Sequence, residues 1–230
     1  MSTLWLYGDS FTEPSGLDYD HDLWWEQLAD KLGVTKVVNQ ARSGLPNSFI
    51  ALKLGEDLPK IKPDDHVFLQ LTDQDRVWLF EKEPRLSNFR NLSEKDNHLT
   101  KAQQKALKEY TVHFFNPTQN QVIRELTKFF ALGATRANTR VLDAFDFMAG
   151  VDGTLVEVSI NEYVGDTVAE RQRNMDKDWR LGEGEKRPNH LSPNNHAILA
   201  DKVYNWFTKS NYMLDLTTDF EKKFLTIPAK

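Results

Sequence analysis

The fold of this chain is decided by the stretch Leu4-Trp5-Leu6-Tyr7-Gly8-Asp9-Ser10-Phe11-Thr12. Its first four residues form a short apolar run, which is typical of a buried strand. Gly8 permits a sharp exit from that strand, so Ser10 is expected at the strand's carboxyl end. A tight turn at such a place exposes a serine hydroxyl and lets a backbone N–H face a developing oxyanion. The stretch therefore predicts a central strand followed by a candidate nucleophile, although Gly-Asp-Ser also occurs in turns for conformational reasons alone.

Four more strands are predicted along the chain. Short apolar runs at residues 36–38, 67–71 and 141–145 indicate buried strands, and the alternating pattern at residues 155–160 indicates a strand nearer an edge. Helical patterns lie between them. Because parallel strands need crossover helices that cover both faces of the sheet, we predict a three-layer α/β/α sandwich with a mostly parallel sheet of about five strands.

Local signals place the ends of the predicted helices. Gly33 is expected to terminate the first helix, Asn47 or Ser48 to cap the second, and Asn116-Pro117 to divide the helical stretch at residues 99–134 into two. Ser192-Pro193 is expected to start a late helix, and a short helix is expected after Thr218. The first helix is identified by an apolar stripe of four residues, Leu23, Trp24, Leu28 and Leu32.

Composition bounds the classes of function. The 230 residues suit a single domain, which we place at 1–230, and the net charge of −5 without long runs of one sign argues against nucleic acid or a membrane as a partner. The sequence contains no cysteine, so a thiolate metal site and a cysteine nucleophile are excluded. Neither a signal peptide nor an apolar run of roughly 20 residues is evident, which predicts a soluble, cytoplasmic protein.

Two polar segments, residues 81–98 and 161–187, follow predicted strands. They would lie at the carboxyl ends of the sheet, where open α/β folds bind ligands, and are therefore candidate lids. The alternative interpretation is that both are solvated excursions of the chain, because long loops are either functional or mobile and sequence does not separate the two.

A histidine that could serve Ser10 as a base is His190, which immediately precedes the predicted late helix. His196 is the competing candidate, but it falls inside that helix, where a role in packing is expected. The order of Gly8-Asp9-Ser10, Asn39 to Gly44, Thr72-Asp73-Gln74-Asp75 and Asn189-His190 resembles the SGNH, or GDSL-type, hydrolase superfamily. The resemblance covers residues 4 to about 208 and implies a flavodoxin-like sheet.

The resemblance also implies roles for single residues. Ser10 would be the nucleophile and one oxyanion donor, Gly44 a second donor through its N–H, and His190 the general base. Gln74 stands where the family has an asparagine, and its amide would be the third donor. The family's acid is replaced by Arg187. His190 would then be oriented by a main-chain carbonyl or by a distant carboxylate, or the site is degenerate; the three candidate carboxylates are Asp178, Glu183 and Glu185.

Charged side chains in or beside these blocks are candidates for substrate binding, namely Asp9, Arg42, Arg76 and Arg187. A guanidinium near a cleft can hold a carboxylate or phosphate, and the alternative is that these arginines pair with nearby carboxylates. Asp73 and Asp75 without a histidine cluster do not make a convincing metal site, so we predict neither a metal nor a cofactor.

The sequence thus predicts a serine esterase that cleaves a small acyl ester, for example an acetyl ester of a carbohydrate or a simple lipid ester, through an acyl-enzyme on Ser10. Its partner would be a small-molecule ester substrate. Two alternatives stay open: a carbohydrate or ligand binding module with a degenerate hydrolase site, and an acyltransferase in which a sugar hydroxyl replaces water.

Overall fold

A computed structural model of the chain describes residues 2–9, 11–13, 22–42, 44–72, 76, 100–113, 116–143, 193–212, 214–216 and 219. The described strands form one parallel sheet in the order β2-β1-β3-β4. Their bounds are β1 Thr3–Tyr7, β2 Lys36–Asn39, β3 His66–Leu71 and β4 Asn138–Asp143. This order matches the first four positions of a flavodoxin-like sheet, in which the chain reverses direction across the sheet between β1 and β3.

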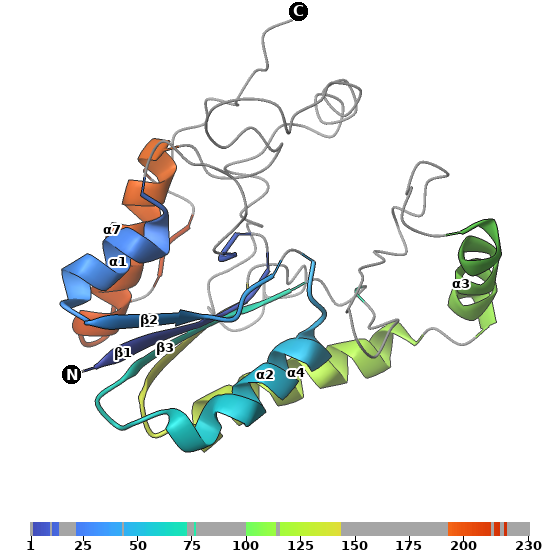
Figure 1. Ribbon diagram of the computed structural model, residues 1–230, viewed down its shortest axis with the longest axis horizontal. Helices are drawn as coiled ribbons and strands as arrows, with labels where there is room; N and C mark the ends of the chain where they lie inside the picture. The colour runs from blue at the N-terminus through green and yellow to red at the C-terminus, as the bar shows by residue number, and fades with distance from the viewer. Residues whose placement is uncertain are drawn as a thin grey trace, which may run out of the picture.

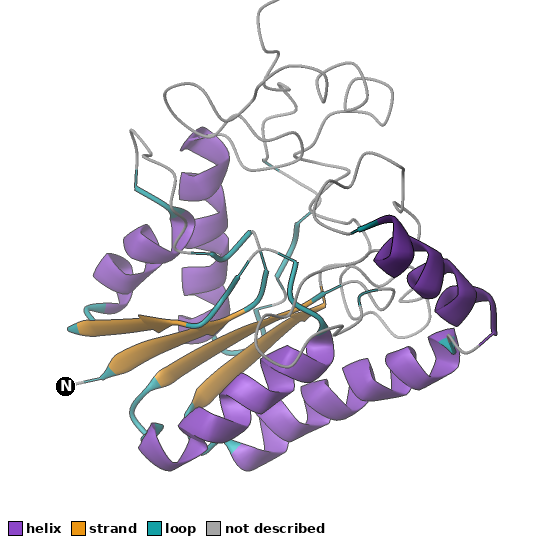
Figure 2. Ribbon diagram, turned by 45° about the vertical axis from the view of Figure 1, so that its right-hand side comes forward, coloured by secondary structure: helices purple, strands orange, loops and turns teal. Residues whose placement is uncertain are grey.

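Helices cover both faces of the sheet, which makes three layers (Figures 1 and 2). On one face lie α1 (Trp24–Leu32) and α7 (Pro193–Thr208), and on the other lie α2 (Asn47–Asp57) and α4 (Pro117–Ala134). A short 3-10 helix, Leu58–Lys60, follows α2, and α3 (Lys101–His113) precedes α4. The predicted α/β/α sandwich with a parallel sheet is therefore the observed fold.

The alternation of side chains along the strands supplies both halves of the core. In β1, Leu4 and Leu6 pack with Trp24 and Leu28 of α1 and with α7, whereas Trp5 and Tyr7 belong to the cluster that includes α2. Both sets are buried, because a central parallel strand is covered on each face. The strand that carries the Gly-Asp-Ser segment is thus paired on both edges and covered on both faces.

Several predicted boundaries are confirmed. Gly33 adopts a left-handed conformation with φ of 66° and ends α1, and the side chain of Asn116 accepts hydrogen bonds from Thr118 N and Gln119 N at the start of α4. These are the features that the sequence indicates, since glycine tolerates positive φ and asparagine satisfies free N–H groups. The predicted strand at 155–160 and the helix after Thr218 lie outside the described residues.

Two predicted boundaries are wrong. Strand β4 begins at Asn138, three residues before the expected start. Its polar first residues are accommodated because Asn138 Nδ2 and Arg140 Nε donate to the main-chain carbonyls of Phe207 and Trp206 at the end of α7. The cap of α2 is also different: Pro46 occupies the N-cap position, and Asn47 is the first helical residue, with its side chain turned to another strand.

Candidate active site

The predicted site residues divide into two groups. Asp9, Arg42, Gly44 and Arg76 are described, and all four follow the carboxyl ends of β1, β2 or β3. The remaining site residues and both candidate lids, 81–98 and 161–187, lie outside the described residues: Ser10, Gln74, His190, Arg187, Asp73, Asp75, Asp178, Glu183 and Glu185. The geometry of the site therefore rests on the residues that flank Ser10 and Gln74 in the chain.

The turn after β1 is held on both sides of position 10. The main-chain carbonyl of Asp9 accepts hydrogen bonds from Thr12 N at 3.0 Å and Glu13 N at 2.9 Å. The side-chain oxygen Oδ1 of Asp9 accepts another from Phe11 N at 3.1 Å, which is the Asx-turn that aspartate favours. Trp24 Nε1 donates to the carbonyl of Phe11 at 2.8 Å and ties the turn to α1. The backbone on each side of residue 10 is thus fixed by buried bonds.

The carboxylate of Asp9 is fully buried and joins β1 to β3. Gln70 Nε2 donates to its Oδ1 at 2.9 Å, and Arg76 Nη1 donates to its Oδ2 at 2.8 Å. Burial of an ionised carboxylate is tolerated when a charge partner and hydrogen bonds replace water, and Asp9 has both. Of the two alternatives for Arg76, the structure shows pairing with a carboxylate, that of Asp9.

Gln70 is a member of this network that the sequence analysis did not identify. Its Oε1 accepts a hydrogen bond from Thr12 Oγ1 at 2.7 Å, while its amide nitrogen binds Asp9. The signal was present in the sequence, because Gln70 interrupts the apolar part of β3, from Val67 to Leu71. A buried amide in such a position requires partners on both its atoms, and here it finds them in the turn after β1.

Gly8 is required by the close approach of this network. A Cβ atom at residue 8 would lie 3.0 Å from Gln70 Cβ, 3.1 Å from Gln70 Oε1 and 3.1 Å from Thr12 Oγ1. We therefore expect Gly8→Ala to lower the free energy of unfolding by about 1–3 kcal/mol through overpacking. Chemical denaturation measures the effect, and Gly55→Ala in α2 is the control, since a Cβ there meets only Phe130 Cζ, at 4.0 Å. Equal stabilities of the Gly8→Ala variant and the wild type would contradict this account of the turn.

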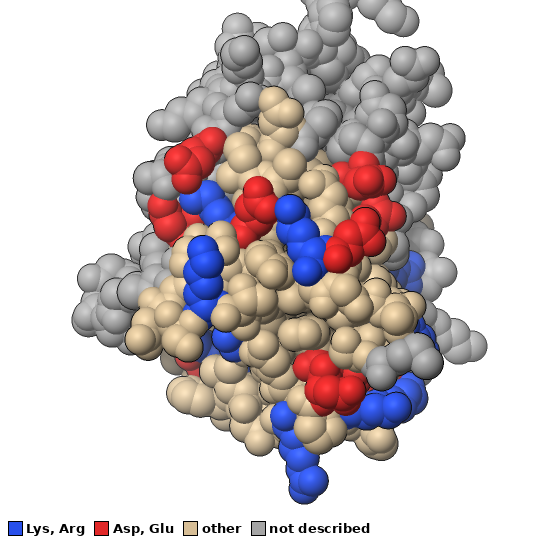
Figure 3. All heavy atoms as spheres, turned by 90° about the vertical axis from the view of Figure 1, so that its left-hand side faces the viewer, with Lys and Arg blue, Asp and Glu red and all other residues tan. Residues whose placement is uncertain are grey.

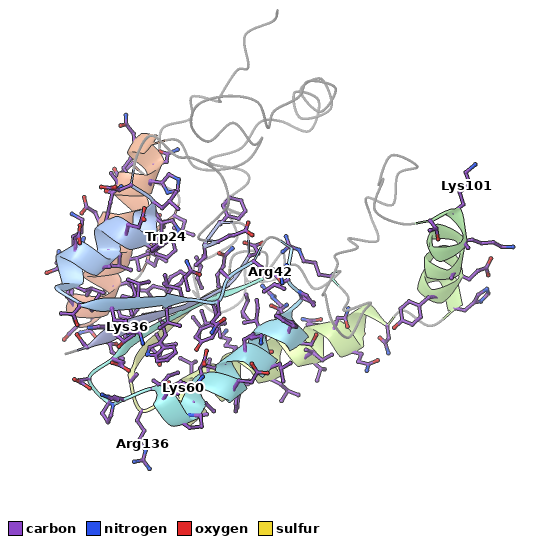
Figure 4. The ribbon with its side chains drawn as sticks, viewed as in Figure 1. Trp24, Lys36, Arg42, Lys60, Lys101 and Arg136 are labelled. Atoms are coloured by element: carbon purple, nitrogen blue, oxygen red, sulfur yellow. The ribbon has the colours of Figure 1, made fainter. Side chains whose placement is uncertain are left out.

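The loop after β2 is bonded to the same turn. Asn39 Nδ2 donates to the carbonyl of Thr12 at 2.6 Å, and Arg42 N donates to the carbonyl of Gly8 at 3.3 Å. Gly44 has φ of 71°, in the left-handed region that favours glycine. The Arg42 side chain is exposed and lies at the opposite end of α2 from Lys60 and Arg136 (Figure 4). The residue proposed as an oxyanion donor, Gly44, thus belongs to a loop held against the Gly-Asp-Ser turn.

The loops after β2 and β3 are joined by Asn47. Its Nδ2 donates to the carbonyl of Thr72 at 2.8 Å, and its Oδ1 accepts from Thr72 N at 2.8 Å. Thr72 Oγ1 donates to the carbonyl of Leu45 at 2.8 Å. Both residues are buried, so the first helical turn of α2 acts as a bracket between Gly44 and the segment that leads to Gln74.

Removing this bracket is expected to be costly. Asn47→Leu would leave the buried N–H and carbonyl of Thr72 without these partners, at about 1–3 kcal/mol for each unsatisfied group. The variant should therefore show a lower denaturation midpoint. Ser48→Ala, at the next position of the same helix, is the control and is expected to change stability by less than about 0.5 kcal/mol. An Asn47→Leu variant as stable as Ser48→Ala would refute the bracket.

A second buried carboxylate, Asp57, supports the loop after β2 from the other end of α2. Its Oδ2 accepts hydrogen bonds from Tyr7 Oη at 3.2 Å and Gln40 Nε2 at 3.0 Å, and Lys60 Nζ lies 2.7 Å from its Oδ1. Burial, reinforced by the charge of Asp57, raises the pKa of Tyr7 well above its usual range. Tyr7 therefore stays protonated and acts as a structural donor beneath the candidate site.

His196, the alternative base, packs against the start of α1. It lies in α7, is buried, and its Nδ1 accepts a hydrogen bond from Trp24 N at 3.0 Å. This acceptor satisfies one of the N–H groups that the start of α1 leaves without an intrahelical partner. The expectation that His196 is a packing residue of its helix is confirmed.

The described part of the chain shows no second candidate site, either as a cluster of metal ligands or as a patch of one charge. Within those residues no group of three histidine, aspartate or glutamate side chains could hold a metal ion, and no helix is long and apolar enough to cross a bilayer. Acidic and basic side chains are interspersed on the face shown in Figure 3. Among the described residues, the buried polar groups at the carboxyl ends of the strands include Asp9, Gln70 and Thr12 as well as Asn47 and Thr72.

Comparison with known proteins gives few matches. No protein family model matches the chain, and no curated protein matches it. Among solved structures, it is similar to a member of the lipolytic protein G-D-S-L family from Veillonella parvula DSM 2008, with 14% identity, coverage of 91% of this chain and 100% of that chain, and a TM-score of 0.37. A candidate lipolytic protein of the same family from Desulfitobacterium hafniense DCB-2 also has 14% identity and a TM-score of 0.37, with 89% and 99% coverage.

Proposed function

We propose that this chain is a serine esterase of the SGNH type that hydrolyses a small acyl ester of a carbohydrate or lipid. One observation carries the proposal: the loops after β1, β2 and β3, which contain the first three motif blocks, are hydrogen-bonded to one another at the carboxyl ends of the strands. The Asp9 bonds to Gln70 and Arg76 connect the carboxyl ends of the neighbouring strands β1 and β3, the end of the sheet at which a flavodoxin-like fold binds its ligand.

The linkage of the loops matters because an oxyanion site must be rigid. Donors stabilise a developing negative charge when they are already aimed at it, so that no reorganisation is needed during the reaction. In the proposal the donors are the N–H groups of Ser10 and Gly44 and the side-chain amide of Gln74. Support comes from their neighbours in the chain. Asp9 and Phe11, on either side of Ser10, are hydrogen-bonded within the turn, and Arg42 N, near Gly44, donates to the carbonyl of Gly8. Thr72 and Arg76, on either side of Gln74, are bonded to Asn47 and Asp9.

In the proposed reaction, Ser10 Oγ attacks the ester carbonyl carbon and His190 accepts the hydroxyl proton. The carbonyl oxygen becomes an oxyanion at the three donors. Collapse of this intermediate breaks the ester bond, and His190 returns the proton to the departing alcohol. Water then attacks the acyl-enzyme with His190 again as base, which releases the carboxylic acid and restores Ser10.

The test is hydrolysis of a series of acyl esters by the full chain. We expect turnover of acetyl and other short-chain p-nitrophenyl esters and of acetylated sugars. In His190→Gln the rate should fall by about a hundredfold or more, because general base catalysis contributes about 10²–10⁴-fold. No turnover of any ester by folded protein would contradict the proposal.

The second candidate is a binding module that retains the fold without the chemistry. It is favoured by the replacement of the family's acid by Arg187 and of its asparagine by Gln74. This alternative predicts that isothermal titration detects binding of an acetylated sugar while product analysis finds no released acid. If the substrate releases its alcohol only when a sugar acceptor is added, and the acyl group is recovered as a new ester of that acceptor and not as free acid, the reaction is acyl transfer.

A further inference from the structure

The side chains that helix α4 buries are not those expected of a helix that covers a sheet. The side chains that it buries are Arg124, Thr127 and Ala131, which share one helical face at a spacing of three and four residues. A helix that covers a sheet normally buries its large apolar side chains and exposes its polar ones. Here the buried face carries an arginine, a threonine and an alanine, and most of the large apolar side chains of α4 lie elsewhere.

These side chains lie on the outward face. Val122 is 51% exposed, Leu126 60% and Phe129 65%, and Phe130 and Leu132 beside them are also exposed. We call these five residues the outer face of α4. Helices α2 and α4 lie side by side on their side of the sheet (Figures 1 and 2), and the ring of Phe130 reaches to 4.0 Å from the Cβ position of Gly55 in α2. Contiguous apolar patches of this kind mark interaction sites.

The spacing of the outer face suits an antiparallel helix pair. Val122, Leu126, Phe129 and Gly133 follow one another at intervals of four, three and four residues, which is the a/d spacing of a coiled-coil seam. In a two-fold antiparallel pair, Leu126 would oppose Phe129 of the second copy, and Val122 would oppose Gly133. The space beside Gly133 is open, since a Cβ there meets nothing within 4 Å. The face is therefore complementary to itself, as a two-fold interface requires.

The area of the face is sufficient for such a pair. If a large apolar side chain buries about 150–250 Å² in full, the exposed fractions of the five residues sum to on the order of 500 Å² per copy. Two copies would then bury on the order of 1,000 Å², which reaches the size at which specific protein interfaces begin.

The charged residues beside the outer face of α4 favour a protein surface, and not a lipid bilayer, as its binding partner. A helix that lies on a membrane carries many lysines and arginines on its polar face. The flanks of the outer face carry one acidic and one basic residue, Glu125 and Lys128, which cancel. In the antiparallel arrangement neither of these residues meets a residue of its own sign, so no like-charge repulsion opposes pairing.

We propose that the outer face of α4 binds the same face of a second copy of this chain in a two-fold, antiparallel dimer. This proposal does not depend on the enzymatic function. Sedimentation velocity of the full chain at micromolar concentrations should give twice the monomer mass of 26.6 kDa. Leu126→Glu combined with Phe129→Glu should restore the monomer mass, whereas Tyr110→Glu on α3, where the side chain is also exposed, should leave the dimer intact.

Cross-linking tests the register. Because the chain contains no cysteine, an introduced thiol is the sole one present. A mixture of Leu126→Cys and Phe129→Cys proteins, one of them carrying a size tag, should form the mixed disulfide in several-fold excess over either homodimer under mild oxidation. A monomeric wild type would overturn the proposal, and so would a monomer that co-sediments with phosphatidylcholine vesicles, a dimer that survives the double glutamate variant, or cross-linking without preference for the mixed pair.

Discussion

Replacing Ser10 by alanine is expected to abolish nearly all ester hydrolysis. The hydroxyl oxygen is the proposed nucleophile, and no other group in the proposed mechanism can form the acyl-enzyme. In subtilisin, a serine protease, loss of the catalytic serine lowers kcat by up to about 10⁶-fold. The catalysis that remains there comes from the oxyanion site and from substrate binding. We therefore expect a loss of at least about a thousandfold in kcat/KM, measured with a short-chain p-nitrophenyl ester.

The loss in this variant should occur without a change in stability. The bonds that hold the turn come from the main chain of Asp9 and Phe11 and from the Asp9 side chain, none of which the substitution removes. Thermal denaturation of Ser10→Ala should therefore match that of the wild type. Ser48→Ala removes a serine hydroxyl from α2 and is the matched control, with activity expected near that of the wild type. A Ser10→Ala variant that retains turnover would exclude the proposed acyl-enzyme.

Arg76→Met is expected to have the largest effect on stability. The substitution removes the positive partner of Asp9, whose carboxylate is fully buried and would be left with hydrogen bonds but no opposite charge from this side chain. Removing one partner of a buried ion pair costs about 3–5 kcal/mol. Urea denaturation should show a correspondingly lower free energy of unfolding. Activity should fall as well, because Asp9 supports the backbone on both sides of Ser10.

Two variants separate this interpretation from a general effect of removing an arginine. Arg42→Met replaces an exposed arginine at the same end of the sheet and should change stability by less than about 0.5 kcal/mol. The double variant Asp9→Asn with Arg76→Met removes both charges and should recover part of the lost stability, which appears as a coupling energy in the mutant cycle. Additive effects of the two substitutions would show that the ion pair is unimportant.

The strands and most helix ends could be predicted because they depend on local sequence. Three of the four observed strands fall on short apolar runs, and glycine or asparagine with proline marks the ends of helices. The errors arise where a residue far away in the sequence determines where a helix or strand begins. Asn47 is a good local cap, but Thr72 engages its side chain, and β4 starts early because α7 supplies carbonyls for Asn138 and Arg140.

The candidate site could be located from sequence but not assembled. Asp9, Arg42, Gly44 and Arg76 were identified by their places in short motifs, and those places put them at the carboxyl ends of neighbouring strands. The partners that hold the loops were missed. A hydrogen bond between Asp9 and Gln70 spans 61 residues, and no local pattern specifies it. Only the unusual polarity of Gln70 within a buried strand signalled that it needed a partner.

The most direct test of the central claim is covalent labelling of the nucleophile. A fluorophosphonate probe reacts with an activated serine, so folded protein should form a single adduct on the peptide that contains Ser10. Mass spectrometry should locate the adduct, and it should disappear in Ser10→Ala and decrease strongly in His190→Gln. Folded wild-type protein that forms no adduct, or an adduct on a serine other than Ser10, would contradict the proposal that this chain is a serine esterase acting through Ser10.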